Sequence, residues 1–350
     1  MKNNTNEFAQ HIGPPRRGVY WILFLIVFST IAFAEKIAVF PDLKRPRNII
    51  IDHDRIFISD CPEIYIYSLK DFKLIKKFGR AGAGPGEFKP TVIHFKINVQ
   101  PDYIFVNSTH KISYFTKEGN LVREMNAGGI GHGFSAFGDR LVGIKEIREG
   151  NTDWTTLTLF DSHLKPLKEL SRIRFAIDEK EVKVLQSSRI VKAGKDKIFI
   201  VMSPDFEIKI FDYNGKLLHI IKRENQEDRV KVNESHKKAV HEYLKLRWRG
   251  YPGIKDRLVF PEYLPAIWGL KYHCREENEE LYVLSRKTRE NKNECFVFNI
   301  QGKLLKKIYL PLKEKNVNSL FPFDIKDGKL YQLIENEDTE NYELFVTEIQ

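Results

Sequence analysis

Short runs of alternating apolar and polar residues recur along most of the chain. Each copy is a strand, a polar turn that often carries Gly, and a second apolar strand, as in Ile208–Leu218 and Cys295–Leu305. Period-two alternation around such a turn indicates a β-hairpin. One aromatic residue recurs at the same place in every copy, at Tyr67, Phe115, Phe160, Phe211, Phe298 and Phe345.

These aromatic residues are about 45–51 residues apart, except for one gap of about 87 residues between Phe211 and Phe298. A second pair of apolar strands precedes each hairpin, for example at 48–52 and 55–59. Four strands in such a period are typical of a propeller blade. The predicted fold class is therefore all-β, a six-bladed β-propeller formed as one domain by residues 35–350.

The last repeat ends after its third strand, whereas Lys36–Phe40 precedes the first repeat and belongs to no other sheet. We predict that this N-terminal strand supplies the missing outer strand of the sixth blade, because closure removes an exposed sheet edge.

The long gap holds a predicted insertion at 224–264, between blades four and five. Its residues Val240, Tyr243 and Leu244 recur at helical spacing. We expect a short amphipathic helix on the propeller surface with these three side chains directed inward.

The first 34 residues differ in composition from the rest. A polar stretch ends in Pro14-Pro15-Arg16-Arg17, and an apolar run from Gly18 to Ala34 follows. A basic segment, an apolar segment and the small-x-small sequence Ala32-Phe33-Ala34 are typical of a signal peptide. We predict export to the periplasm or the extracellular space. Retention of residues 1–34 as a membrane anchor is the alternative, because the run is just long enough to cross a bilayer.

A Gly-rich segment, Phe-Gly-Arg-Ala-Gly-Ala-Gly-Pro-Gly-Glu-Phe-Lys-Pro, stands at 78–90 between the first two repeats. It resembles the inter-blade signature of NHL-type repeats. Together with the six hairpins, it makes the chain similar to bacterial six-bladed NHL-like or TolB-like propellers of uncharacterised function. Gly82, Gly84 and Gly86 would permit positive φ where the chain crosses between blades, and Phe88 would pack between them. No helix or GK[ST] element follows to support a phosphate site.

The chain carries 57 basic and 47 acidic side chains, a formal net charge of +10, and removal of residues 1–34 leaves about +8. The basic residues are interspersed with Asp and Glu, whereas nucleic-acid binding needs a concentrated basic stripe. The charge therefore argues against nucleic acid and fits mild attraction to acidic glycans, lipid head groups or acidic proteins. The three cysteines, Cys61, Cys274 and Cys295, are an odd number, so at least one thiol is free or pairs between chains.

The long connections of this predicted propeller all fall on one face, at 79–90, 127–133, 148–154, 171–188, 224–264 and 286–294. Binding sites usually lie where loops grow on one face of a rigid scaffold. We therefore expect a protein, peptide or glycan to bind this face at or near the central channel, without a cofactor. The candidate binding residues are Arg80, Glu87, His132, Trp154, Arg247, Trp248, Arg249 and Tyr251.

A metal-dependent hydrolase or lyase is the alternative function. Such an enzyme would need several His, Asp or Glu ligands on first strands that face the channel. His94, His273 and Asp324 are the candidates for holding Ca or Zn. The ligand patterns of gluconolactonase-like and peptide-amidating lyase propellers are not recognisable. The sequence favours a non-enzymatic binding or scaffold protein outside the cytoplasm.

Overall fold

The structure is a computed structural model, which describes residues 34–89, 95–174, 181–186, 190–223, 229–247, 250–275, 278–316 and 319–349. Residues 33–350 form one compact unit. The signal-peptide prediction falls on residues outside the described part and stays a prediction. No helix among the described residues is long and apolar enough to cross a bilayer.

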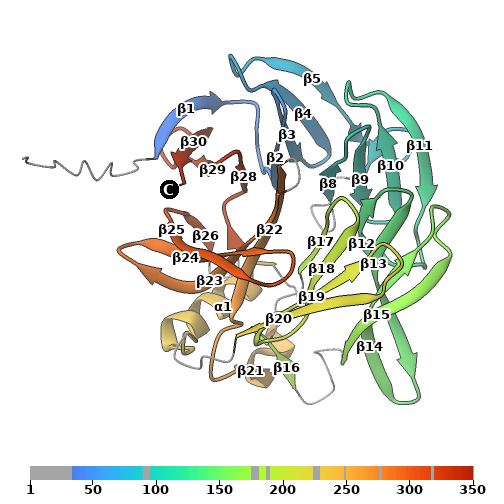
Figure 1. Ribbon diagram of the computed structural model, residues 1–350. Coiled ribbons are helices and arrows are strands. Elements are labelled where there is room, and N and C mark those ends of the chain that lie inside the picture. The colour runs from blue at the N-terminus through green and yellow to red at the C-terminus, as the bar shows by residue number, and fades with distance from the viewer. Residues whose placement is uncertain are drawn as a thin grey trace, which may run out of the picture. The chain divides into compact units, whose positions relative to one another are not determined.

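Six antiparallel sheets of four strands stand as blades around a common axis (Figure 1). Blade one contains β2 (Asn48–Asp52), β3 (Arg55–Asp60), β4 (Glu63–Ser68) and β5 (Leu74–Phe78). Blade two contains β8 (Lys96–Val99), β9 (Ile104–Ser108), β10 (Lys111–Phe115) and β11 (Leu121–Asn126). Blade three contains β12 (His132–Phe137), β13 (Arg140–Glu149), β14 (Thr152–Phe160) and β15 (Pro166–Arg174).

Blade four contains β17 (Ile190–Ala193), β18 (Lys197–Val201), β19 (Phe206–Asp212) and β20 (Leu217–Arg223). Blade five contains β22 (Ile267–Arg275), β23 (Asn278–Arg289), β24 (Lys292–Asn299) and β25 (Leu304–Leu310). Blade six contains β28 (Phe323–Lys326), β29 (Lys329–Glu335), β30 (Tyr342–Glu348) and β1 (Glu35–Phe40). The first strand of every blade lies innermost, and each contacts the first strand of the next blade, from β2 round to β28 and back.

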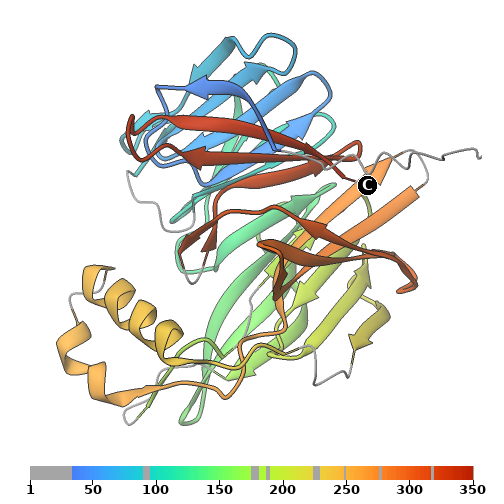
Figure 2. The ribbon, with the colours of Figure 1, turned by 90° about the vertical axis from the view of Figure 1, so that its left-hand side faces the viewer.

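The N-terminal strand closes the ring, as the sequence predicts. β1 pairs antiparallel with β30, with Glu35 opposite Val346 and Phe40 opposite Tyr342. The blue β1 lies beside the red C-terminal strands in Figure 2. Because β1 covers β30, the third strand of blade six is not an open edge.

The core is divided into buried clusters that lie between neighbouring blades, and such a cluster fills each of the six interfaces. Five of the six recurrent aromatic residues are buried, and Phe345 is half-buried because Tyr342 and Leu344 occupy the buried face of β30. Phe88 is 1% exposed and packs with Phe57 of blade one and Phe95 of blade two. The prediction that Phe88 packs between blades is confirmed.

Three small pairs of strands connect the blades. β6 (Arg80–Ala81) runs parallel to β7 (Glu87–Phe88), and β26 (Glu314–Asn316) is antiparallel to β27 (Ser319–Leu320). β16 (Val182–Lys183) runs parallel to β21 (Leu258–Val259) and joins the insertion to the connection before blade four.

The insertion contains α1 (Glu234–Arg247) and two 3-10 turns at Tyr251–Gly253 and Lys255–Arg257. Asn233 caps the helix, because its side-chain oxygen accepts a hydrogen bond from the backbone N–H of His236 at 3.0 Å. Val240 is buried and Leu244 is half-buried, as predicted. The predicted inward position of Tyr243 is wrong: this residue is 38% exposed, because only a narrow stripe of the helix is covered.

Candidate functional site

The two faces of the propeller carry different connections. Turns from first to second strands and from third to fourth strands are short, as at His53–Asp54 and Asn214–Gly215, and they form the short-loop face. The connections between blades and the turns from second to third strands form the opposite face, which we call the loop-rich face. The predicted long connections at 148–154 and 286–294 are wrong: the strands continue through most of these residues and leave two-residue turns at 150–151 and 290–291. α1 stands on the loop-rich side of the ring in Figure 2.

Arg80 and Glu87 bind each other within the Gly-rich crossing from blade one to blade two. Nε of Arg80 donates a hydrogen bond of 2.7 Å to one oxygen of Glu87, and a second guanidinium nitrogen lies 2.7 Å from the same oxygen. The Gly84 N–H donates to the other oxygen at 2.8 Å. These donors hold the pKa of Glu87 below its usual range, first through the Gly84 N–H and then through Arg80. Lys111 donates to the carbonyl oxygens of Gly84 and Glu87. Arg80 and Glu87 therefore stabilise the conformation of this loop.

Gly82 is required where the loop turns, since its φ is +157° and an added Cβ would lie 2.0 Å from a carboxylate oxygen of Glu87. We expect Gly82→Ala to lower the free energy of unfolding by about 1–2 kcal/mol through this strain. Urea unfolding of the single and double variants checks it. The same substitution in a Glu87→Ala background should cost less, because the clashing carboxylate is gone. An equal cost in both backgrounds would contradict the proposed clash.

His132 and Trp154 both belong to blade three, near the loop-rich face. His132 Nε2 lies 3.7 Å from a carboxylate oxygen of Glu146, and the guanidinium of Arg172 stacks over Trp154 at 5.3 Å from the ring centroid. Arg80 and Glu87 thus lie at the crossing from blade one to blade two, whereas His132 and Trp154 lie on blade three.

The remaining candidates come from the insertion. Arg247 is the last residue of α1 and Tyr251 the first of the following 3-10 turn. Trp248 and Arg249 lie outside the described residues. Their role in binding stays a prediction.

A basic groove lies between α1 and the connections that precede blades one and six. Its volume is about 740 Å³. We define the basic groove by its lining residues Lys44, Arg45, Arg47, Tyr243, Leu246, Lys315, Asn316, Ser319, Glu335 and Tyr342. Leu246 is 83% exposed and stands one helical turn after Tyr243, so α1 contributes an apolar wall to a cleft whose opposite wall is cationic.

A buried carboxylate fixes the cationic wall. Asp60 is 5% exposed and accepts hydrogen bonds from the backbone N–H groups of Lys44 and Arg45 at 2.5 and 2.8 Å. Burial raises the pKa of Asp60, and those two N–H groups oppose the shift. The loop is therefore held in place through its backbone while its basic side chains remain exposed.

One carboxylate in the basic groove already has partners within the protein. Glu335 accepts a hydrogen bond from the Tyr342 hydroxyl at 2.8 Å and lies 3.9 Å from Lys315. No ion pair within the described part of the chain involves the side chains of Lys44, Arg45 or Arg47. These three cations therefore give the groove a net positive charge that favours an anionic ligand.

Two of the three candidate metal ligands lie near the channel, and the third, His94, is outside the described residues. Asp324 accepts a hydrogen bond from the Ile51 N–H at 2.9 Å and pairs with Lys271 at 3.3 Å. His273 lies 3.9 Å from Asp327, and burial lowers its pKa. No group of three His, Cys, Asp or Glu residues able to hold a metal occurs in the described ranges.

A second cavity, the channel pocket, opens on the short-loop face and has a volume of about 550 Å³. The inner strands of five blades line it, together with Gly138 in the turn after β12. Lys192 of β17, Lys271 of β22 and Asp324 of β28 supply charged groups, and Ile50 and Tyr272 supply apolar surface. The pocket is thus at the opposite end of the channel from the predicted loop-rich binding face.

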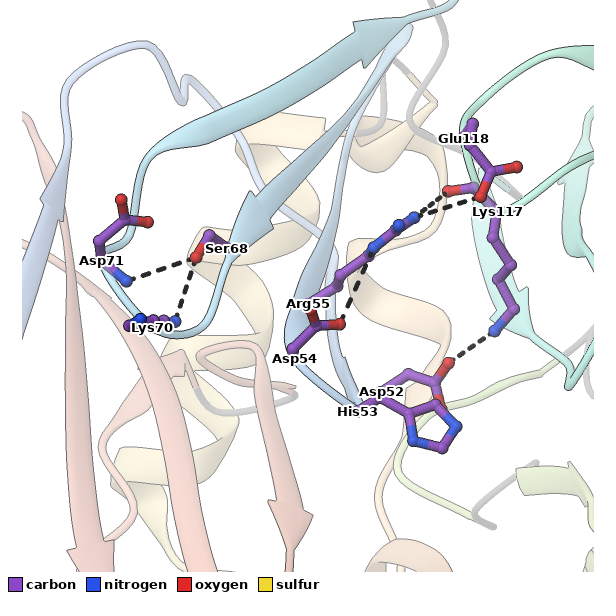
Figure 3. A network of polar contacts seen from close by, with 9 residues as sticks. All are labelled: Asp52, His53, Asp54, Arg55, Ser68, Lys70, Asp71, Lys117 and Glu118. Atoms are coloured by element: carbon purple, nitrogen blue, oxygen red, sulfur yellow. Dashed lines mark hydrogen bonds and ion pairs between the residues drawn. The ribbon is translucent and has the colours of Figure 1, made fainter.

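The negative charge of Asp52, at the rim of this pocket, is neutralised by Lys117 of blade two. Its carboxylate accepts a hydrogen bond of 2.6 Å from Lys117, and Arg55 donates to the Lys117 carbonyl at 3.0 Å (Figure 3). Arg55 also lies 3.6 Å from Glu118. These contacts join the short turns of blades one and two at the short-loop face.

The sequence does not single out the basic residues of either cavity. A local signal does exist for the channel, because Lys192 and Lys271 each stand between two apolar residues in the first strand of a blade. In the basic groove, Lys44, Arg45 and Arg47 lie in the connection between β1 and β2. This connection is not among the predicted long connections.

No protein-family model matches the chain, and no curated protein matches its sequence. Among solved structures, the chain is similar to a protein of Bacteroides fragilis NCTC 9343 that is inferred to be exported. The two are 11% identical, the likeness covers 91% of this chain and 95% of the other, and the TM-score is 0.57. A member of the DUF4221 family from Bacteroides vulgatus is 12% identical over 90% of this chain and 97% of its own, with a TM-score of 0.48. At such identities the first likeness concerns the propeller fold alone.

Proposed function

We propose that this chain is an exported, non-enzymatic binding propeller that holds an acidic peptide segment of a partner protein in its basic groove. The observation that carries the proposal is the asymmetry of that groove. Lys44, Arg45 and Arg47 line one wall without ion pairs among the described residues, and α1 presents exposed apolar surface on the other. Export rests on the signal-peptide pattern of residues 1–34.

A peptide fits this groove better than an acidic glycan does. Cations alone would suit either ligand, but Leu246 offers an aliphatic side chain that is 83% exposed at the same cleft. Apolar side chains beside glutamate or aspartate can bury that surface, whereas a glycan rich in hydroxyl groups cannot. The expected ligand is therefore a segment in which acidic and aliphatic residues alternate.

Fluorescence anisotropy with a short labelled peptide of glutamate and leucine tests the proposal. Wild-type protein should bind it, and the Gln-for-Glu counterpart should bind at least about tenfold more weakly. Arg45→Glu combined with Arg47→Glu should reduce affinity by at least about tenfold, because like charges then face each other. Raising the salt concentration should weaken wild-type binding, since the cations are exposed.

Lys70→Glu combined with Lys73→Glu is the matched control. This pair makes the same change of charge, but in an exposed turn of blade one on the short-loop face. It should leave peptide affinity within about twofold of wild type. Equal loss in both double variants would mean that net charge alone drives binding, and the proposal would be wrong. Binding of a sulfated polysaccharide but not of the peptide would also overturn it.

A further inference from the structure

Three lysines from different blades converge on the channel. Lys96 begins β8, Lys192 lies in β17 and Lys271 lies in β22, and all three occupy innermost strands. Lys192 is close enough to both others for their charges to act on its ammonium group. Lys192 and Lys271 line the channel pocket itself.

The acidic groups nearby neutralise only part of this cluster. Asp324 uses one oxygen for Lys271 and the other for the Ile51 N–H. Asp52 pairs with Lys117. Among the described residues, Lys96 and Lys192 have no carboxylate partner at ion-pair distance. The channel therefore carries positive charge that the protein does not balance.

Such unbalanced charge is unfavourable in a confined space. Lys192 is half-buried, with the surrounding inner strands close to its ammonium group. Desolvation there, followed by repulsion from Lys271 and Lys96, lowers the pKa of Lys192 to about 7, and Asp324 opposes the shift only in part. Desolvation by the protein around it also lowers the pKa of Lys96, although this residue is exposed. A bound anion would replace the missing carboxylate, since an opposite charge within hydrogen-bond reach favours the charged ammonium.

The cavity also limits the size and polarity of such a ligand. A volume of about 550 Å³ lies in the usual range for small-molecule sites. Ile50, Val99 and Tyr272 add apolar surface beside the charged groups. We propose that the channel pocket binds a small organic anion, whose carboxylate or phosphate contacts Lys192 and Lys271 while its apolar body packs against the inner strands. This site is independent of the peptide-binding groove.

Calorimetric titration at about pH 6 with benzoate, phenyl phosphate and the neutral benzamide tests the proposal. At least one of the two anions should bind saturably, and benzamide should not. Binding of benzoate alone identifies a carboxylate site, and binding of phenyl phosphate alone a phosphate site. If neither anion binds saturably, or if benzamide binds as well as the anions do, the channel pocket is not an anion site.

Lys192→Met should weaken binding of the anion by at least about tenfold, because it removes one of the two charged contacts. Lys216→Met is the matched control, since Lys216 is an exposed lysine of the same blade outside the channel. It should leave affinity within about twofold of wild type. Unchanged affinity in Lys192→Met would refute the assignment. Far-ultraviolet circular dichroism of both variants establishes that each retains its strands.

The pH dependence of binding separates a direct contact from a structural role. Wild-type affinity should fall as the pH rises above about 7, where Lys192 loses its proton in the unliganded protein. At about pH 8 the complex should therefore take up protons, measured as a dependence of binding enthalpy on the buffer. A wild-type affinity that is independent of pH across this range would count against Lys192 as a contact.

Discussion

Replacing Phe40 with alanine should lower the free energy of unfolding by about 3–5 kcal/mol, the usual cost of removing a buried phenyl ring. Phe40 is 1% exposed, although it lies on the strand that enters the propeller from the N-terminus. Its ring centroid is 4.4 Å from that of Tyr67, so it joins blade six to blade one. The substitution leaves a cavity at the point where the ring closes.

Val39→Ala is the control in guanidinium chloride unfolding. Val39 precedes Phe40 on β1 but is 46% exposed, so its truncation should change stability by less than about 0.5 kcal/mol. A large effect of Phe40→Ala with an unchanged dependence on denaturant would mean that β1 unfolds together with the rest of the ring. If both substitutions had equally small effects, β1 would not contribute to the cooperative structure and closure would be unimportant for stability.

Much of the propeller can be predicted from the sequence because its repeats are local. Alternation and turn chemistry define a hairpin within a few residues, as for Ile208–Leu218, which the structure forms as β19 and β20. The missing fourth strand of the last repeat then leaves Lys36–Phe40 as its partner. Phe88 follows the same logic, since an aromatic residue at a crossing between blades has few places to pack.

Other features depend on contacts with distant parts of the chain, so local sequence patterns do not predict them. The hairpin pattern gives Phe345 the same role as its counterparts, but Leu344 and Tyr342 take the buried face of β30. Helical spacing gives Tyr243 the same orientation as Val240, yet how much of a helix is covered depends on what packs against it. In both cases, tertiary contacts decide which face is buried.

The candidate site is the least predictable part for the same reason. The long loops predict a binding site on the loop-rich face. The cations of the basic groove, however, lie in the connection between β1 and β2, which is not one of these loops. Lys192 and Lys271 stand far apart in sequence, and the packing of blade four against blade five brings their charges together. A single lysine in a strand does not by itself predict a charged cluster. The cluster can be recognised only from the contact between β17 and β22 in the folded protein.

The charge at Lys192 should make stability depend on pH. We expect the free energy of unfolding of the wild type, relative to Lys192→Met, to rise by about 2 kcal/mol between about pH 7 and about pH 9. In the folded protein, burial followed by Lys271 and Lys96 lowers the pKa of Lys192 to about 7, whereas an unfolded lysine titrates near about 10.4. Between these values the unfolded chain binds more protons. Raising the pH therefore favours the folded state.

The measurement is chemical unfolding of both proteins at several pH values without added anions. Below about pH 7 the penalty for burying the charged Lys192 is fully present, so Lys192→Met should be the more stable protein there. The difference should shrink as the pH rises, because the folded wild type then holds a neutral amine. Lys216→Met, which alters an exposed lysine of the same blade, should follow the wild type throughout. A difference between wild type and Lys192→Met that did not change with pH would show that Lys192 keeps an ordinary pKa, and that the channel lysines do not act on one another.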